Sequence, residues 1–248
     1  MIVTQTERNG RIRKLTFKTW CCLWVVVLLC LLVPMRCTAL KVGLFVAGVS
    51  VWGLTWHLFG RRPIVRTGCI AAAAIAGALF AFVLLPGHSY NKSELRSEYV
   101  RSLQAYLGTP YVWGGGNHLG IDCSGLVERA LVDAYLKRAL LTANPALARE
   151  AISLWWHNRS ARALGEGYRD DTRLLREERE LNTADYSQME PGDLAVLSDG
   201  IHVLAYVGSQ TWIEADPLSM RTIVAKAPRN TDAYFSMRVR LVRWRTLE

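Results

Sequence analysis

Acidic residues are almost absent from the first third of this 248-residue chain. Glu7 is the only one among residues 1–87, against ten lysines and arginines. Residues 88–248 contain twenty residues of each sign, so the net charge of +9 comes entirely from the first part. Because the second part has no electrostatic excess for phosphate, the sequence predicts no nucleic-acid partner. With 51% hydrophobic residues, the composition also excludes a disordered chain.

Charged residues are missing altogether from two long apolar runs, residues 42–60 and 68–87. Each run has about 20 residues, enough for a helix to cross a hydrocarbon core of ~30 Å. A shorter apolar run, residues 20–35, precedes them and contains Pro34 near its end. We therefore expect residues 1–87 to form a membrane anchor of three transmembrane helices, with the lipid bilayer as its partner.

The basic residues of the anchor are distributed unevenly among its connecting segments. Two of them lie between the first and second runs, three lie between the second and third, and five precede the first run: Arg8, Arg11, Arg13, Lys14 and Lys18. Basic residues favour the cytoplasmic side, so the N-terminus is expected inside and residues 88–248 outside. The sequence thus predicts a multi-pass protein of the bacterial inner (cytoplasmic) membrane whose second part faces the periplasm or cell wall.

Cysteine is scarce in the second part, where Cys123 is the only one. A domain in an oxidising compartment usually pairs its thiols, and a single cysteine cannot form an internal disulfide. Cys123 opens a helical pattern directly after a glycine-rich segment, residues 108–122. At the first turn of a helix, the dipole and the free N–H groups favour the nucleophilic thiolate. Cys123 is therefore a candidate nucleophile.

A nucleophilic cysteine needs a base and a group that orients the base. Of the histidines in the second part, His202 is the best placed, because it opens a predicted strand directly after a tight turn. Glu214 lies on the next predicted strand, where its carboxylate can reach the second ring nitrogen. Asp216, two residues further on, is the alternative. From the residues alone, a packed cysteine and a structural histidine remain open as alternatives.

The order of the predicted elements indicates an α+β domain with an antiparallel sheet over residues 88–248. A capping pair, Asn91 and Glu94, begins one helix, and a second helix starts at Cys123. The charged residues 139–186 are interpreted as a solvated helical insertion. Strands are predicted afterwards at residues 193–197, 202–207, 212–214, 222–225 and 235–244.

Three motifs in this part resemble, in the same order, those of the NlpC family of cell-wall cysteine peptidases. They are Tyr111-Val112-Trp113-Gly114-Gly115 followed by Asp122-Cys123-Ser124-Gly125, then Pro191-Gly192-Asp193-Leu194, then the segment from His202 to Gly208. The resemblance implies a papain-like fold and hydrolysis of amide bonds in peptidoglycan stem peptides.

The resemblance also implies a role for several residues. It makes Cys123 the nucleophile and His202 the general base, and its third position, often a histidine, falls on Glu214. The motif positions that line the substrate cleft in relatives fall on Tyr111, Asp122 and Ser124. No metal and no cofactor is implied, and the sequence assigns no protein partner. The alternative is a catalytically silent wall-binding or scaffold protein at the membrane, which the retained Cys, His and acid disfavour.

Overall fold

We describe residues 5–248 of the protein from a computed structural model. Its internal contacts divide the chain into two compact units. One unit comprises the residues up to Val33 together with Cys37–Leu85, and the other comprises Pro34–Arg36 together with Pro86–Glu248. The division falls close to the predicted boundary at residue 87, but the short turn Pro34–Arg36 joins the second unit.

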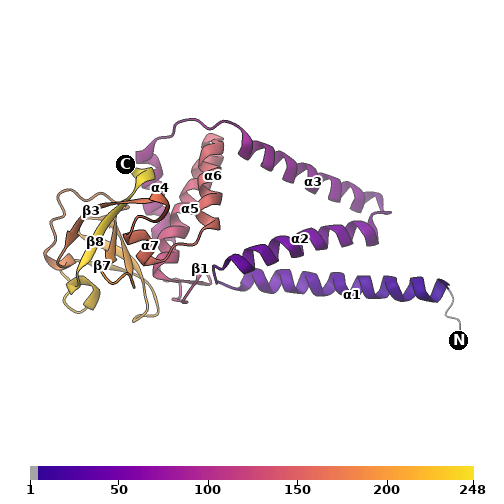
Figure 1. Ribbon diagram of the computed structural model, residues 1–248, viewed down its shortest axis with the longest axis horizontal. Helices are drawn as coiled ribbons and strands as arrows, with labels where there is room; N and C mark the ends of the chain where they lie inside the picture. Colours follow the sequence, from indigo (N-terminus) through magenta and orange to yellow (C-terminus); the bar gives the residue numbers. More distant parts are fainter. Residues whose placement is uncertain (1–4) are drawn as a thin grey trace. The chain divides into compact units, whose positions relative to one another are not determined.

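The first unit consists of three helices, α1 (Gln5–Leu32), α2 (Thr38–Phe59) and α3 (Pro63–Leu84) (Figure 1). Each contains a stretch long and apolar enough to cross a membrane: Gly10–Leu32, Thr38–Phe59 and Pro63–Leu84. The prediction of three apolar helices is confirmed, although α1 starts well before residue 20. It ends just before Pro34, because the residue preceding a proline is disfavoured in helical conformation.

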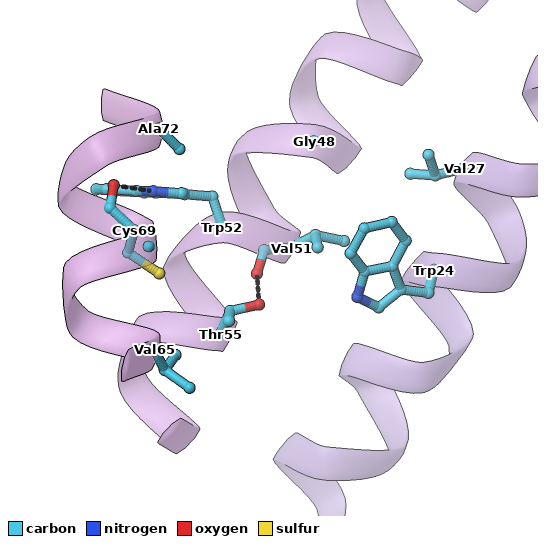
Figure 2. A pocket seen from close by; sticks show the side chains of 10 residues that line it. Trp24, Val27, Gly48, Val51, Trp52, Thr55, Val65, Cys69 and Ala72 are labelled. Atoms are coloured by element: carbon cyan, nitrogen blue, oxygen red, sulfur yellow. Dashed lines mark hydrogen bonds between the residues drawn. The ribbon is translucent and has the colours of Figure 1, made fainter. Parts of the chain in front are cut away.

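Indole donors connect the three helices. Trp20 Nε1 donates to the Thr55 hydroxyl (2.8 Å) between α1 and α2, and Trp52 Nε1 donates to the Cys69 carbonyl (3.2 Å) between α2 and α3. Figure 2 shows the small pocket between the helices, with Trp24 on one side and Cys69 on the other. Polar contacts of this kind between apolar helices pair side-chain donors with acceptors on a neighbouring helix.

The second unit begins with α4 (Lys92–Ala105) and continues with α5 (Cys123–Thr142), α6 (Pro145–Trp156) and α7 (Ala161–Gly165). The Asn91 side chain accepts hydrogen bonds from the backbone N–H groups of Ser93 and Glu94, as the capping pattern predicts. In α5 the periodic apolar positions are buried, so the predicted face of this helix is its core face: Leu126, Ala130, Leu131, Ala134 and Tyr135.

A six-stranded antiparallel sheet follows the helices, which confirms the α+β class. Its order is β3-β8-β4-β5-β6-β7, with the bounds β3 Thr172–Glu178, β4 Leu194–Leu197, β5 Val203–Gly208, β6 Thr211–Asp216, β7 Arg221–Lys226 and β8 Val239–Trp244. Alternate strand residues point to opposite faces. Leu204, Trp212 and Leu241 lie in a buried cluster with Phe235, while α5 packs against β5 and β6.

Short elements complete the unit. The glycine-rich segment contains a small hairpin of β1 (Gly116–Asn117) and β2 (Gly120–Ile121). Within this unit, three 3-10 turns lie between longer elements and a fourth follows β8: η1 Tyr168–Asp170, η2 Leu181–Thr183, η3 Ala233–Ser236 and η4 Arg245–Leu247.

Two expectations need correction. Residues 139–186 are helical through Gly165, but β3 is an edge strand that pairs with β8. Its charges mimic a solvated helix face because they form cross-strand pairs at an exposed edge, such as Glu177 with Arg240 (3.3 Å). Residues 235–238 do not form strand either, because the Asp232 carboxylate accepts the Tyr234 N–H and caps η3.

Candidate active site

Cys123 is the first residue of α5, and Asp122 is the N-cap that fixes this helix start. One oxygen of Asp122 accepts the Gly125 N–H (2.5 Å), and the other accepts the Gly114 N–H (2.8 Å). The Ser124 hydroxyl donates to the same carboxylate (3.0 Å). A single side chain therefore joins the glycine-rich loop to the helix start. This arrangement holds the Cys123 thiol, which is buried, in one position.

His202 lies immediately before β5, and Glu214 lies on the neighbouring strand β6. The Nε2 atom of His202 is 2.7 Å from the Oε2 atom of Glu214. Cys123 is among the groups that raise the pKa of His202, so its side chain lies close to the imidazole. Since Nε2 faces the carboxylate, Nδ1 is left for the sulfur. The structure thus brings together Cys123, His202 and Glu214, three residues selected from the sequence.

Two opposing effects act on the imidazole of His202. Burial disfavours its charged form and on its own lowers its pKa. Hydrogen bonds to Cys123 and Glu214 and the attraction of their negative charges act against burial and outweigh it. Together they raise the pKa of His202 to about 10. The ring is therefore an imidazolium at neutral pH, with a proton to give on each side.

The Glu214 carboxylate is completely buried. Burial raises its pKa above the ordinary value, while the hydrogen bond and charge of His202 act in the opposite direction. Among residues 5–248, no hydrogen-bond partner reaches its Oε1 atom. His202 is consequently the group that stabilises the negative charge of Glu214.

Asp216, the alternative orienting residue, has another role in this structure. Its two carboxylate oxygens accept the backbone N–H groups of Leu218 (2.8 Å) and Ser219 (2.9 Å) in the turn after β6. Although burial opposes the change, these hydrogen bonds lower the pKa of Asp216. The geometry assigns the contact with the imidazole to Glu214 and the turn to Asp216.

The other histidines of the second unit have structural contacts. The His118 ring stacks on Tyr106 (centroids 4.1 Å apart), and His157 Nδ1 lies 2.9 Å from the Ser153 carbonyl. The His88 backbone bonds to the side chain of Asn144. None of these contacts involves Cys123, which leaves His202 as the histidine at the thiol.

Tyr234 is a site residue that the sequence analysis did not select. Its ring stacks on His202 with centroids 4.1 Å apart and planes inclined by 19°. Tyr234 reaches the site from η3, in the long connection between β7 and β8. A flat aromatic surface against the imidazole restricts its rotation about χ2. No motif spacing indicates this residue, because it depends on how that connection folds back.

A cleft with a volume of about 600 Å³ opens at the thiol. Tyr111, Asp122 and Ser124, the predicted substrate-cleft residues, all line it, as do Cys123 and Arg36. Burial, followed by the nearby charges of Cys123 and Asp122, raises the pKa of Tyr111, so its hydroxyl stays protonated and can donate. Arg36 was not selected from the sequence. It lies in the short segment between the first two apolar runs, outside every motif.

The arrangement is suited to nucleophilic acyl transfer. It combines a thiol at a helix N-terminus, an imidazole close to that thiol, a buried carboxylate hydrogen-bonded to the imidazole and an open cleft in front. These features are the ones expected of a Cys–His–acid site on an α+β fold.

The sequence pattern of the NlpC/P60 family matches residues 108–240, which is more than half of the chain. The chain therefore belongs to the NlpC/P60 family. The matched region contains every candidate site residue except Arg36.

Among curated proteins, the chain is 44% identical over 43 residues to dipeptidyl-peptidase 6 of Lysinibacillus sphaericus, a match that spans 17% of this chain and 16% of that protein. Solved structures similar to the chain include the peptidoglycan hydrolase RipB of Mycobacterium tuberculosis (TM-score 0.40, 21% identity, 64% of this chain and 67% of RipB). Another is NlpC1 of Trichomonas vaginalis (TM-score 0.42, 17% identity, 65% of this chain and 48% of NlpC1).

Proposed function

We propose that this protein is a membrane-anchored peptidoglycan hydrolase that cuts amide bonds in stem peptides by a cysteine mechanism. The observation that carries the proposal is the contact of His202 with both Cys123 and Glu214, inside the region that matches the NlpC/P60 family. The substrate class follows from membership of that family and from the motif resemblance described above.

In the first half of the reaction, the Cys123 thiolate attacks the carbonyl carbon of the scissile amide. The backbone N–H of Cys123 points from the helix start and can stabilise the oxyanion that forms. The His202 imidazolium gives a proton to the amine nitrogen as the carbon–nitrogen bond breaks. The products of this half are a free amine and a thioester on Cys123.

In the second half, neutral His202 takes a proton from a water molecule, and the resulting hydroxide attacks the thioester carbon. The carbon–sulfur bond breaks, which releases a carboxylic acid and restores the thiolate–imidazolium pair. Glu214 keeps the imidazole in one orientation through both halves and stabilises its charged form. Tyr111 and Ser124 line the cleft where the substrate peptide binds.

The location proposed for this reaction is the outer face of the cytoplasmic membrane. Arg36 precedes α2 and residue 86 follows α3, yet both belong to the same compact unit. If α2 crosses the membrane outward to inward, α3 must cross back, which places the domain and the α1–α2 turn on one side. The basic N-terminal segment supports the cytoplasm as the opposite side.

The test is incubation of the purified full chain, in detergent, with muropeptides of known structure, beside a Cys123→Ala variant. Mass spectrometry should detect new fragments with the wild type only, and their masses identify the bond that is cut. Thermal melting of the variant, expected to match the wild type, confirms that it is folded. Intact substrate with a folded wild type would instead support the silent wall-binding alternative.

A further inference from the structure

The turn between α1 and α2 is built into the loop that precedes Cys123. The Arg36 N–H donates to the Gly114 carbonyl (2.7 Å), and the Gly116 N–H donates to the Pro34 carbonyl (2.8 Å). Met35 and Gly115 form an antiparallel bridge between these two hydrogen bonds. The turn therefore adds a short piece of strand to the glycine-rich loop.

The guanidinium of Arg36 binds the start of the nucleophile helix. Its Nε donates to the Gly115 carbonyl (3.1 Å), and its Nη2 donates to Asp122 Oδ1 (3.0 Å) and to the Ser124 hydroxyl (2.9 Å). Its Nη1 lies 3.1 Å from Glu128 Oε2. The fixed fork of an arginine suits such a set of acceptors, which a lysine cannot bind together.

The charge of Arg36 is needed where it lies. Asp122 and Glu128 are both buried near the N-terminus of α5, and each forms an ion pair with Arg36. Glu128 also accepts a hydrogen bond from the backbone N–H of Arg159 (2.7 Å), which is an uncharged donor. Without Arg36, Asp122 and Glu128 would each lose an ion pair, and losing an ion pair is costly for a buried carboxylate.

Gly116 provides an independent observation, because the space beside it is filled by Arg36. A Cβ atom added at Gly116 would lie 2.1 Å from Cδ and 2.2 Å from Cγ of Arg36. The third nearest atom, at 3.2 Å, is Nε of the same side chain. Gly116 is not among the glycines with positive φ, so its backbone does not require glycine. Glycine is needed at position 116 because the Arg36 side chain occupies the space that a Cβ atom would fill.

We propose that Arg36 is a positioning residue of the active site. It acts through Asp122 and Ser124, which it fixes at the N-terminus of the helix that carries Cys123. The inference rests on the proposed function and extends it: the turn Pro34–Arg36, between α1 and α2, belongs to the second unit and contributes a residue to its active site. A chain that started at residue 88 would keep Cys123, His202 and Glu214 but would lack this contact.

The first part of the test compares Arg36→Ala, Arg36→Lys and Arg61→Ala in the full chain. Misplacement of the nucleophile helix should lower kcat by about 100-fold in Arg36→Ala, with KM changed by less than about 3-fold. Arg36→Lys should recover part of the loss, since it restores the charge but not the fork. Arg61, exposed in the turn between α2 and α3, is the control for loss of one positive charge in an interhelical turn and should leave kcat unchanged.

The second part uses Gly116→Ala, which displaces Arg36 without removing any charge. It should lower kcat by itself, yet have no further effect in an Arg36→Ala background, where the added methyl group has room. This non-additivity identifies the contact between the two positions. Equal losses in both backgrounds would show that Gly116 matters for another reason and would overturn the proposal, as would an Arg36→Ala variant with kcat within 2-fold of wild type.

A third arm needs no substrate and separates this proposal from the proposed function. If wild type leaves muropeptides intact, the proposed function fails, and the alkylation rate of Cys123 by iodoacetamide at pH 7 decides the role of Arg36. Peptide mass spectrometry locates the modified cysteine. The rate should fall about tenfold or more in Arg36→Ala and Gly116→Ala, because a positive charge near a cysteine favours its thiolate and these variants remove or displace that charge. Unchanged rates would overturn the proposal.

Discussion

The Nε2 atom of His202 lies 2.7 Å from the Oε2 atom of Glu214, and both side chains are almost completely shielded from solvent. The other carboxylate oxygen, Oε1, has no hydrogen-bond partner within the described part of the chain. The negative charge of Glu214 and the positive charge of His202 therefore depend on each other. A change to either residue should alter both the orientation and the protonation of the imidazole.

Glu214→Gln should lower kcat by about 10²–10⁴-fold while the protein stays folded. The amide is nearly isosteric with the carboxylate, but it carries no charge to stabilise the imidazolium and can present an N–H in place of an acceptor. Steady-state kinetics on a muropeptide substrate measure the effect. The matched control is Asp216→Asn, two residues further along β6, which should keep kcat near wild type. A large loss in Asp216→Asn with wild-type rates in Glu214→Gln would reverse the assignment.

The pKa of His202 should be about 10 in the wild type and should fall in Cys123→Ala. The substitution removes a hydrogen bond and a negative charge that favour the imidazolium, and the opposing effect of burial remains. NMR titration of ring-labelled histidine in the full chain measures both values. An unchanged pKa in Cys123→Ala would show that the thiolate does not stabilise the imidazolium.

The raised pKa of His202 also predicts how its contribution to the stability of the folded protein changes with pH. Because the folded-state pKa of His202 lies above the ordinary value of 6.5, its contribution is fully present below pH 6.5. It is lost as the pH rises from there through about 10. The difference in melting temperature between wild type and His202→Ala should therefore shrink between these two pH values, and a difference that grows would contradict the assignment.

Tyr234→Ala should lower kcat by about tenfold, with a smaller change in KM, because the imidazole loses the ring on which it stacks. Tyr234→Phe keeps the stacking surface and serves as the control, so its kcat should stay within about 2-fold of wild type. Equal losses in both variants would instead assign the effect to the phenol hydroxyl.

Asp193→Ala should destabilise the second unit without acting on the chemistry directly. Asp193 is fully buried, and Arg243 binds both of its carboxylate oxygens at 2.7 and 2.8 Å. Breaking a buried pair of this kind costs roughly 3 kcal/mol, which corresponds to a melting temperature lower by about 5–10 °C. Glu177→Ala removes the exposed Glu177–Arg240 pair of the same sheet and should change the melting temperature very little. If Asp193→Ala and Glu177→Ala lowered the melting temperature by similar amounts, the buried pair would not be more important for stability than the exposed one.

Part of this architecture could be predicted because local chemistry determines it. Asn91 and Asp122 are helix caps, and a cap is recognisable from a few adjacent residues. The antiparallel pairing of β5 with β6 brings His202 and Glu214 together, and this pairing joins two strands that the sequence predicts as neighbours in the chain. The contact of these two residues with Cys123 depends on how α5 packs against the sheet, which local patterns do not predict. That contact was expected because the three sequence motifs occur in the order typical of the family.

The residues that escaped prediction depend on long-range contacts. Arg36 is 86 positions from Asp122 in the chain and reaches it only because α2 and α3 return the chain to the same side. Its one available signal is its charge, since it stands in a segment that the charge distribution places outside the cytoplasm. The edge strand β3 was wrongly expected to be helical, because acid–base alternation is typical of both an exposed helix and a paired edge strand.

The most direct test of the account is a comparison of two cysteines in the same full chain. Cys37 is exposed and Cys123 is buried, so accessibility alone would make Cys37 react faster with a peptide-based alkylating reagent. If Cys123 is an activated nucleophile in a wall-peptide cleft, it should instead react at least tenfold faster than Cys37 at pH 7. An excess of muropeptide should then slow Cys123 alone. A Cys123 that reacts more slowly than Cys37, at a rate that muropeptide does not change, would contradict the account.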